Sequence, residues 1–227
     1  MAEDVRDSGL SSSLTDLMTS LAVIFILLLV ASLNNVKQSG ELARNAILLK
    51  LQQELQRELK DFRNEGFEVR NDPKDPLGLI VIVPEGLLNF ELNKFTIPKQ
   101  GSEFLGKIIP KMALILCSKD FRSEINSVIV EGHTDTTGTE QINLPLSQAR
   151  SLAVVQECLF LLDSTATGGN ENEELRRCFL DFLSATGRGS VDPYMKDGVI
   201  DLNRSRRVVF KIRIRSLEQR VLTELLG

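Results

Sequence analysis

The sequence predicts one N-terminal transmembrane helix followed by a globular α/β domain, an α+β sandwich with a mixed sheet. Three observations support this prediction. A run of apolar residues lies close to the N-terminus. Further on, segments rich in β-branched residues alternate with segments of helical periodicity. The 227 residues leave room for one anchor and one medium-sized domain. The net charge of −4 and the isoelectric point near 5.3 exclude nucleic acid as the main partner.

The uninterrupted apolar run extends from Leu21 to Ala31. At ~1.5 Å of rise per residue, such a run covers about half of a ~30 Å hydrocarbon core. A spanning helix must therefore include the residues just before the run, and we predict a transmembrane helix over residues 14–35. Residues 1–13 form a short polar tail before this helix.

Asp16 lies at or inside the membrane boundary of this helix, with Thr19 and Ser20 one turn further along the same face. A carboxylate at the centre of a membrane costs about 2.5–3.5 kcal/mol on insertion scales, and such residues mark ion routes. We therefore take Asp16, Thr19 and Ser20 as candidate ion-conducting residues. The alternative is that Asp16 caps the helix at the lipid headgroups.

Residues 36–70 are predicted to form a helical stalk or linker. Apolar side chains recur there at spacings of three and four, namely Leu48, Leu51, Leu55, Leu59 and Phe62. Such a stripe packs either on the chain's own domain or on a second copy in a parallel dimer stalk. Of the two, we expect the dimer stalk.

Residues 71–216 are predicted to form the globular domain, and residues 217–227 a terminal helix. The expected strands are Leu77–Val83, Leu87–Phe90, Ile125–Glu131, Ala185–Gly189 and Ser205–Arg215. The expected helices are Pro98–Cys117, which Pro110 should kink or interrupt, Leu146–Leu162 and Glu173–Leu183.

The three cysteines and the single histidine form no metal-binding spacing, so we expect no metal and no cofactor. Cys158 and Cys178 flank a polar loop. We expect them to form a disulfide if the domain lies in an oxidising compartment, with Cys117 buried.

The chemistry concentrates between residues 131 and 150, where the sequence is EGHTDTTGTEQINLPLSQAR. Three parts of the sequence resemble the OmpA-like peptidoglycan-binding domain. The first lies in this stretch and consists of Gly132-His133-Thr134-Asp135, Gly138, Asn143, Leu146-Ser147 and Arg150. The other two are FELNKFTIPKQG from residue 90 and Arg206-Arg207-Val208 near the end. Outer-membrane proteins and flagellar-type stator B subunits share this domain. The resemblance covers about residues 77–215, and one departure is Ser205, where the common pattern has Asn.

The resemblance implies a peptidoglycan-binding site formed by Asp135, Arg150, Asn143, Thr134 and Arg206. Diaminopimelate in the wall peptide carries an ammonium and a carboxylate on one carbon centre. Asp135 would accept from the ammonium, and Arg150 would bind the carboxylate. The alternative is an Asp135–Arg150 salt bridge that serves only the fold.

His133 is interpreted as structural. No second histidine or acid cluster supports catalysis, so the chain is not predicted to be an enzyme.

Residues 15–19, TDLMT, resemble the membrane helix of the same stator B subunits, in which the Asp carries the coupling ion. This implies a homodimer inside a pentameric ring of MotA/ZorA-like membrane subunits, driven by protons, with sodium as the alternative.

Three features look more like the B subunits of Zorya anti-phage defence systems than like flagellar ones. They are the short acidic tail, the helix directly after the membrane segment and the region 158–178. Two alternatives remain open: a flagellar-type stator for motility, and a passive wall tether without ion flux.

A wall-binding domain implies a single-pass protein of the bacterial inner membrane, with a cytoplasmic N-terminus and a periplasmic C-terminal domain. The charges flanking the membrane segment favour the opposite orientation. Only Arg6 precedes the helix, whereas Lys37, Arg44 and Lys50 follow it. The resemblance is given more weight than this bias.

Overall fold

The computed structural model describes residues 4–88, 90–91, 93–164 and 170–226. The chain divides into two compact units, Met1–Ala43 and Arg44–Gly227. The first helix, α1 (Asp4–Glu58), contributes residues to both units, and each unit is described by itself.

The first unit is helical throughout its described residues. It contains an 18-residue window with a mean hydropathy of 2.4, of which the chain itself buries nothing. In the described part of the chain, α1 is the one helix long and apolar enough to cross a membrane. A helix that is apolar on all sides and uncovered by protein fits a lipid environment, so this finding agrees with the predicted transmembrane segment.

The second unit contains a five-stranded mixed sheet in the order β1-β2-β7-β3-β4. Its strands are β1 (Glu68–Asn71), β2 (Gly78–Pro84), β3 (Ile125–His133), β4 (Leu183–Gly187) and β7 (Arg207–Ile214). All neighbours are antiparallel except β3 and β4, which are parallel. The α+β class and the mixed sheet predicted from the sequence are confirmed.

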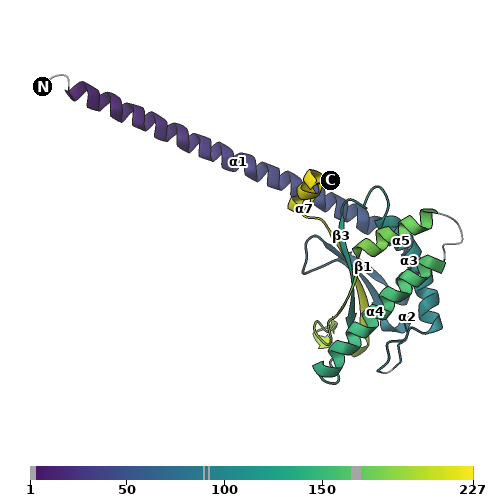
Figure 1. Ribbon diagram of the computed structural model, residues 1–227. Helices are drawn as coiled ribbons and strands as arrows, with labels where there is room; N and C mark the ends of the chain where they lie inside the picture. Colours follow the sequence, from purple (N-terminus) through teal and green to yellow (C-terminus); the bar gives the residue numbers. More distant parts are fainter. Residues whose placement is uncertain (1–3, 89, 92, 165–169, 227) are drawn as a thin grey trace. The chain divides into compact units, whose positions relative to one another are not determined.

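Three helices lie on one face of this sheet, α3 (Lys99–Leu116), α4 (Glu140–Ser164) and α5 (Asn170–Phe182) (Figure 1). Register places Val81, Phe210 and Val130 in one row across β2, β7 and β3, and all three belong to the main core. Side chains alternate between faces along a strand. Ile80, Ile82 and Val209 therefore lie on the other face, where they form a separate apolar cluster.

The last turns of α1 are part of the main core of the second unit. Leu48, Leu51, Leu55 and Leu59 are all buried there. The 3-10 helix η1 (Lys60–Glu65) and Gly66, with a φ of 86°, end this segment. The dimer-stalk prediction is therefore wrong for this stripe, because its apolar face is already occupied by the chain's own domain.

The α3 helix continues through Pro110 rather than breaking there. Ile108, Ile109, Met112 and Ala113 are fully buried on both sides of the proline. We attribute the continuity to this burial, which offsets the loss of one backbone hydrogen bond at the proline.

Other elements differ from the predicted ones. The strand expected over residues 87–90 is wrong, because residues 87 and 88 belong to a helical turn, α2 (Glu85–Leu88), and residue 89 lies outside the described residues. The α4 helix begins six residues before the predicted Leu146. The sequence did not predict β1, the helical turn α6 (Leu202–Ser205) or the hairpin of β5 (Met195–Lys196) and β6 (Val199–Ile200). The terminal helix α7 (Leu217–Leu226) agrees with the prediction.

Leu51→Ala tests whether the stripe belongs to the domain core. We expect the free energy of unfolding to fall by about 2–5 kcal/mol, because the truncation removes a fully buried side chain and leaves a cavity. Urea unfolding of the detergent-solubilised full chain, followed by circular dichroism, measures this. The matched control is Leu49→Ala on the exposed face, which should change stability by less than about 0.5 kcal/mol. A destabilisation that disappears at high protein concentration would instead support a dimer stalk.

Candidate functional site

The candidate wall-binding site forms where β3 ends and α4 packs back onto the sheet. Two glycines allow this packing. A Cβ on Gly132 of β3 would lie 2.1 Å from the carbonyl oxygen of Ser147, and a Cβ on Gly187 of β4 would lie 2.4 Å from the backbone nitrogen of Gln148. The backbone of α4 therefore contacts the sheet directly. The Ser147 hydroxyl adds a hydrogen bond, which it accepts from the Gly189 N–H at 2.8 Å.

Asp135 lies in the loop between β3 and α4 and is almost fully buried. Its Oδ2 accepts a hydrogen bond from Arg206 Nη1 at 2.8 Å, which is also an ion pair. Its Oδ1 accepts from the backbone N–H of Thr137 at 2.9 Å and from the Thr137 hydroxyl. Burial raises the pKa of this carboxyl, but the bonds from Thr137 and Arg206 outweigh burial and hold the pKa below its ordinary value. The site thus presents a fixed carboxylate at neutral pH.

Arg150 projects from α4 and is also buried. Its Nε donates to the carbonyl oxygen of Lys94 at 3.1 Å, and its Nη2 donates to that of Glu91 at 3.4 Å. The guanidinium carbon lies 4.9 Å from the centre of the Phe90 ring, in cation–π geometry. The segment before α3 therefore fixes the position of this cation.

Asn143 and Thr134 have different roles in the candidate site, since the first holds a loop and the second has a free hydroxyl among the described residues. Asn143 Nδ2 donates to the carbonyl oxygen of Thr137 at 2.9 Å and so fastens the loop that carries Asp135. The backbone N–H of Thr134 donates to Gly189 at 2.9 Å. The Thr134 hydroxyl oxygen is buried and has no hydrogen-bond partner among the described residues. A buried hydroxyl without a partner is costly, so this group is suited to bind a ligand or a water molecule.

Arg206 follows α6, and its Nη2 donates to Asn203 Oδ1 at 2.8 Å. Ser205, which stands where the family pattern has Asn, is fully buried. Its hydroxyl donates to the Asp201 carbonyl at 2.7 Å and accepts from the Tyr194 N–H at 3.0 Å. In this chain Ser205 therefore fastens the loop before β7.

The structure thus brings together Asp135, Arg206 and the loop held by Asn143, and it holds Arg150 on α4. The Asp135 partner that sequence analysis missed is Thr137. Its position two residues after an aspartate is the spacing of an Asx turn, which was the available signal. The contact of Arg150 with Phe90 had no signal in the sequence, because 60 residues separate the two.

His133 is the last residue of β3 and is buried. Its Nδ1 lies 3.3 Å from the Val191 carbonyl oxygen, and its Nε2 lies 3.6 Å from Glu131 Oε2. Burial lowers the pKa of this imidazole, although the contact with Glu131 opposes the shift. Within the described ranges, no three His, Cys, Asp or Glu side chains come together as a metal site.

The candidate ion-conducting residues Asp16, Thr19 and Ser20 are exposed on α1. The Thr19 hydroxyl donates to the backbone carbonyl of Asp16 at 2.9 Å. Thr19 therefore uses its proton within the helix and can offer a cation only its lone pairs.

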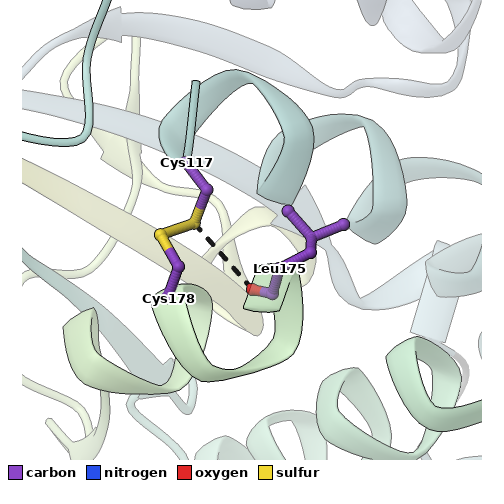
Figure 2. Close-up of a disulfide and its surroundings, with 3 residues drawn as sticks. All are labelled: Cys117, Leu175 and Cys178. Atoms are coloured by element: carbon purple, nitrogen blue, oxygen red, sulfur yellow. Dashed lines mark hydrogen bonds between the residues drawn. A yellow bond between two sulfur atoms is a disulfide. The ribbon is translucent and has the colours of Figure 1, made fainter. Parts of the chain in front are cut away.

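The predicted Cys158–Cys178 disulfide is wrong. The structure pairs Cys117 with Cys178, with their Cα atoms 6.0 Å apart (Figure 2). Cys117 directly follows the last residue of α3 and Cys178 lies in α5, so the disulfide joins two helices that cover the sheet. The Cys117 sulfur also lies 3.9 Å from the Leu175 carbonyl oxygen, but a disulfide sulfur carries no proton to donate. Cys158 is a free thiol inside α4, and burial raises its pKa.

Solved structures similar to the chain include wall-anchoring and MotB-type domains. The periplasmic domain of Helicobacter pylori MotB matches with 17% identity and a TM-score of 0.48, over 71% of this chain and 90% of that one. A putative MotB-like protein from Desulfovibrio vulgaris matches with 19% identity and a TM-score of 0.49, over 79% and 99%. The cell wall anchor of the T6SS from Pseudomonas aeruginosa matches with 22% identity and a TM-score of 0.46, over 71% and 97%.

By sequence, the chain is similar to two proteins named Zorya protein ZorB. The protein from Escherichia coli O139:H28 is 27% identical over 179 residues, which are 74% of this chain and 69% of that protein. The protein from Escherichia coli strain ATCC 8739 is 26% identical over 223 residues, 88% and 86% of the two chains. No family model matches the chain.

The lowered pKa of Asp135 sets the sign of a pH dependence. An unfolded Asp titrates near its ordinary value of 3.8, and the folded group titrates below it. Its stabilising contribution is therefore fully present above about pH 5 and is lost as the pH falls through the folded pKa. We expect Asp135→Asn to lower the free energy of unfolding by about 1–3 kcal/mol at pH 7. The difference in unfolding free energy between the two proteins should shrink as the pH falls below 3.8 and on through the folded pKa.

Urea unfolding of the unmodified chain and of Asp135→Asn between pH 3 and pH 7 measures this difference. The control is Asp120→Asn, because Asp120 and its partner Lys50 are 62% and 55% exposed. Asp120→Asn should lower the free energy of unfolding by less than about 1 kcal/mol at any pH. A deficit in Asp135→Asn that is the same at pH 3 and pH 7 would contradict the assignment.

Proposed function

We propose that the chain is the B subunit of an ion-driven membrane motor of the Zorya anti-phage type, anchored to peptidoglycan by its second unit. One observation carries the proposal: a chain similar to ZorB over most of its length combines an Asp-bearing apolar helix with the Asp135–Arg150 site. The partners are a second copy, a ring of ZorA-like subunits and the cell wall. Protons are the proposed coupling ion.

The geometry of the site supports wall binding. Diaminopimelate needs one anion and one cation in fixed positions. Asp135 is an ionised carboxylate held by Arg206 and Thr137, and Arg150 is a buried cation held by backbone carbonyls. Each carboxylate oxygen has two acceptor positions, so Asp135 can also accept from a ligand ammonium. The unpartnered Thr134 hydroxyl adds one more polar contact.

The disulfide supports a periplasmic location for the second unit. Disulfides persist in oxidising compartments such as the periplasm and are rare in the cytosol. The Cys117–Cys178 bond belongs to this unit. We therefore propose that the N-terminus is cytoplasmic, against the weak charge bias around the membrane segment.

Co-sedimentation of the detergent-solubilised full chain with purified peptidoglycan tests the anchor. We expect Asp135→Ala and Arg150→Ala to lose at least tenfold in wall binding, because each removes one of the two charges. The control variants are Asp120→Ala and Arg122→Ala, which truncate exposed charges outside the site. Circular dichroism shows whether each variant is folded. Unchanged retention of both folded site variants would refute the wall-binding assignment.

Phage plating and swimming assays of the chain in its native gene neighbourhood test the motor. We expect Asp16→Asn to abolish phage protection while membrane and wall association persist, because an amide cannot exchange a proton. The control is Ser32→Ala on the same helix, which removes an exposed hydroxyl outside the candidate ion-conducting residues and should retain the protection. Loss of swimming instead would indicate a motility stator. Full phage protection in Asp16→Asn would refute the motor and leave a passive tether.

A further inference from the structure

The face of the sheet that α3, α4 and α5 do not cover carries a cleft of about 540 Å³. Its apolar floor is the cluster of Ile80, Ile82 and Val209, and we call it the open-face cleft. The turn after β1 and the loop before β5 form two of its walls. A volume of this size falls in the ~300–1,000 Å³ range typical of small-molecule sites. None of the proposed wall-binding residues lines it.

The acidic groups of the cleft already have cationic partners. Lys211 Nζ lies 3.1 Å from Glu131 Oε2 and 3.6 Å from Asp72 Oδ2. Asp192 forms an ion pair with Lys74 that joins the two walls. Burial raises the pKa of Glu131, but His133 and Lys211 outweigh burial and hold this pKa below its ordinary value. Each carboxylate of the cleft therefore has a lysine partner, and Asp72 and Glu131 share Lys211.

Two guanidinium groups of the cleft lack such a counterion. Arg207 donates to the carbonyl oxygens of Ser205 at 3.1 Å and Asp192 at 3.0 Å, which are neutral acceptors. Arg70 is exposed and makes no ion pair with any residue that the structure describes. Within the described residues, no carboxylate oxygen lies within 4.0 Å of either guanidinium.

Arg70 and Arg207 both line the open-face cleft, from two strands of the sheet. Arg70 of β1 stands in one row with Ile80 and Lys211, whereas Arg207 stands four residues further back along β7. At ~3.3 Å per residue the two rows are about 13 Å apart along the strands, and β2 lies between β1 and β7. A ligand that contacts both guanidinium groups therefore lies between the two long side chains. Burial lowers the pKa of Arg207, and the charge of Arg70 lowers it further, although Asp192 opposes both effects.

We propose that the open-face cleft binds an amphiphilic anion, whose carboxylate or phosphate monoester is held by Arg70 and Arg207 and whose apolar body lies on Ile80, Ile82 and Val209. A planar guanidinium donates two parallel hydrogen bonds to either head group. The ligand relieves the repulsion between the two arginines and covers an apolar cluster that no helix covers. This inference does not depend on the wall-binding or motor function.

Isothermal titration calorimetry of the full chain in an uncharged detergent tests the proposal with three probes of one shape: benzoate, phenyl phosphate and benzamide. We expect saturable one-to-one binding of the anions and at least tenfold weaker binding of the neutral amide. The tighter of the two anions identifies the preferred head group. Equal binding of benzamide and the anions, or no saturable binding of either anion, would overturn the proposal.

Arg70→Gln is the decisive variant, because Arg70 makes no internal ion pair and its replacement should leave the melting temperature unchanged. We expect it to weaken anion binding at least tenfold. Arg207→Gln should weaken it further, but it also removes the bonds to Ser205 and Asp192 and could impair folding. The matched control is Arg122→Gln, an exposed arginine outside the cleft, which should bind like the unmodified chain. Unaltered affinity in folded Arg70→Gln would refute the site.

Discussion

The direct contact between the backbone of α4 and the sheet is the constraint on which the candidate wall-binding site depends. Gly132 and Gly187 leave no side chain between the helix and strands β3 and β4, so α4 lies closer to the sheet than ordinary packing allows. This approach fixes the short loop that carries Asp135 and the helix that carries Arg150. The Ser147 hydroxyl then bonds the loop that follows β4, which joins three separate chain segments at one place.

Charge within the second unit is arranged in two different ways on the two sides of the sheet. In the candidate wall-binding site, a carboxylate is held by a cation and by hydroxyl and amide donors, so its charge is fixed and its pKa is low. In the open-face cleft, the carboxylates are paired with Lys211 and Lys74, and two arginines have no carboxylate partner among the described residues. The first arrangement suits a zwitterionic ligand, and the second suits an anion.

The α1 helix shows how one secondary structure serves two environments. Its apolar residues from 21 to 31 are continuous around the helix and are left uncovered by the chain. Its residues Leu48, Leu51 and Leu55 form a single stripe, continued by Leu59 just after the helix, that is buried in the domain core. A helix uniformly apolar on all sides suits lipid, whereas a one-sided stripe suits a protein surface.

The sequence by itself determined the apolar span with Asp16, the strands at residues 77–83 and 125–131, and the clustering of polar residues after β3. These depend on local composition and periodicity, which a sequence displays directly. Only the tertiary structure decided what each apolar or charged group meets. The leucine stripe packs on its own core, Cys117 rather than Cys158 pairs with Cys178, and Arg206 holds Asp135. The physical reason is that periodicity shows which face of an element is buried but not against what. Contacts between residues 60 or 70 positions apart depend on how strands and helices are ordered around the sheet.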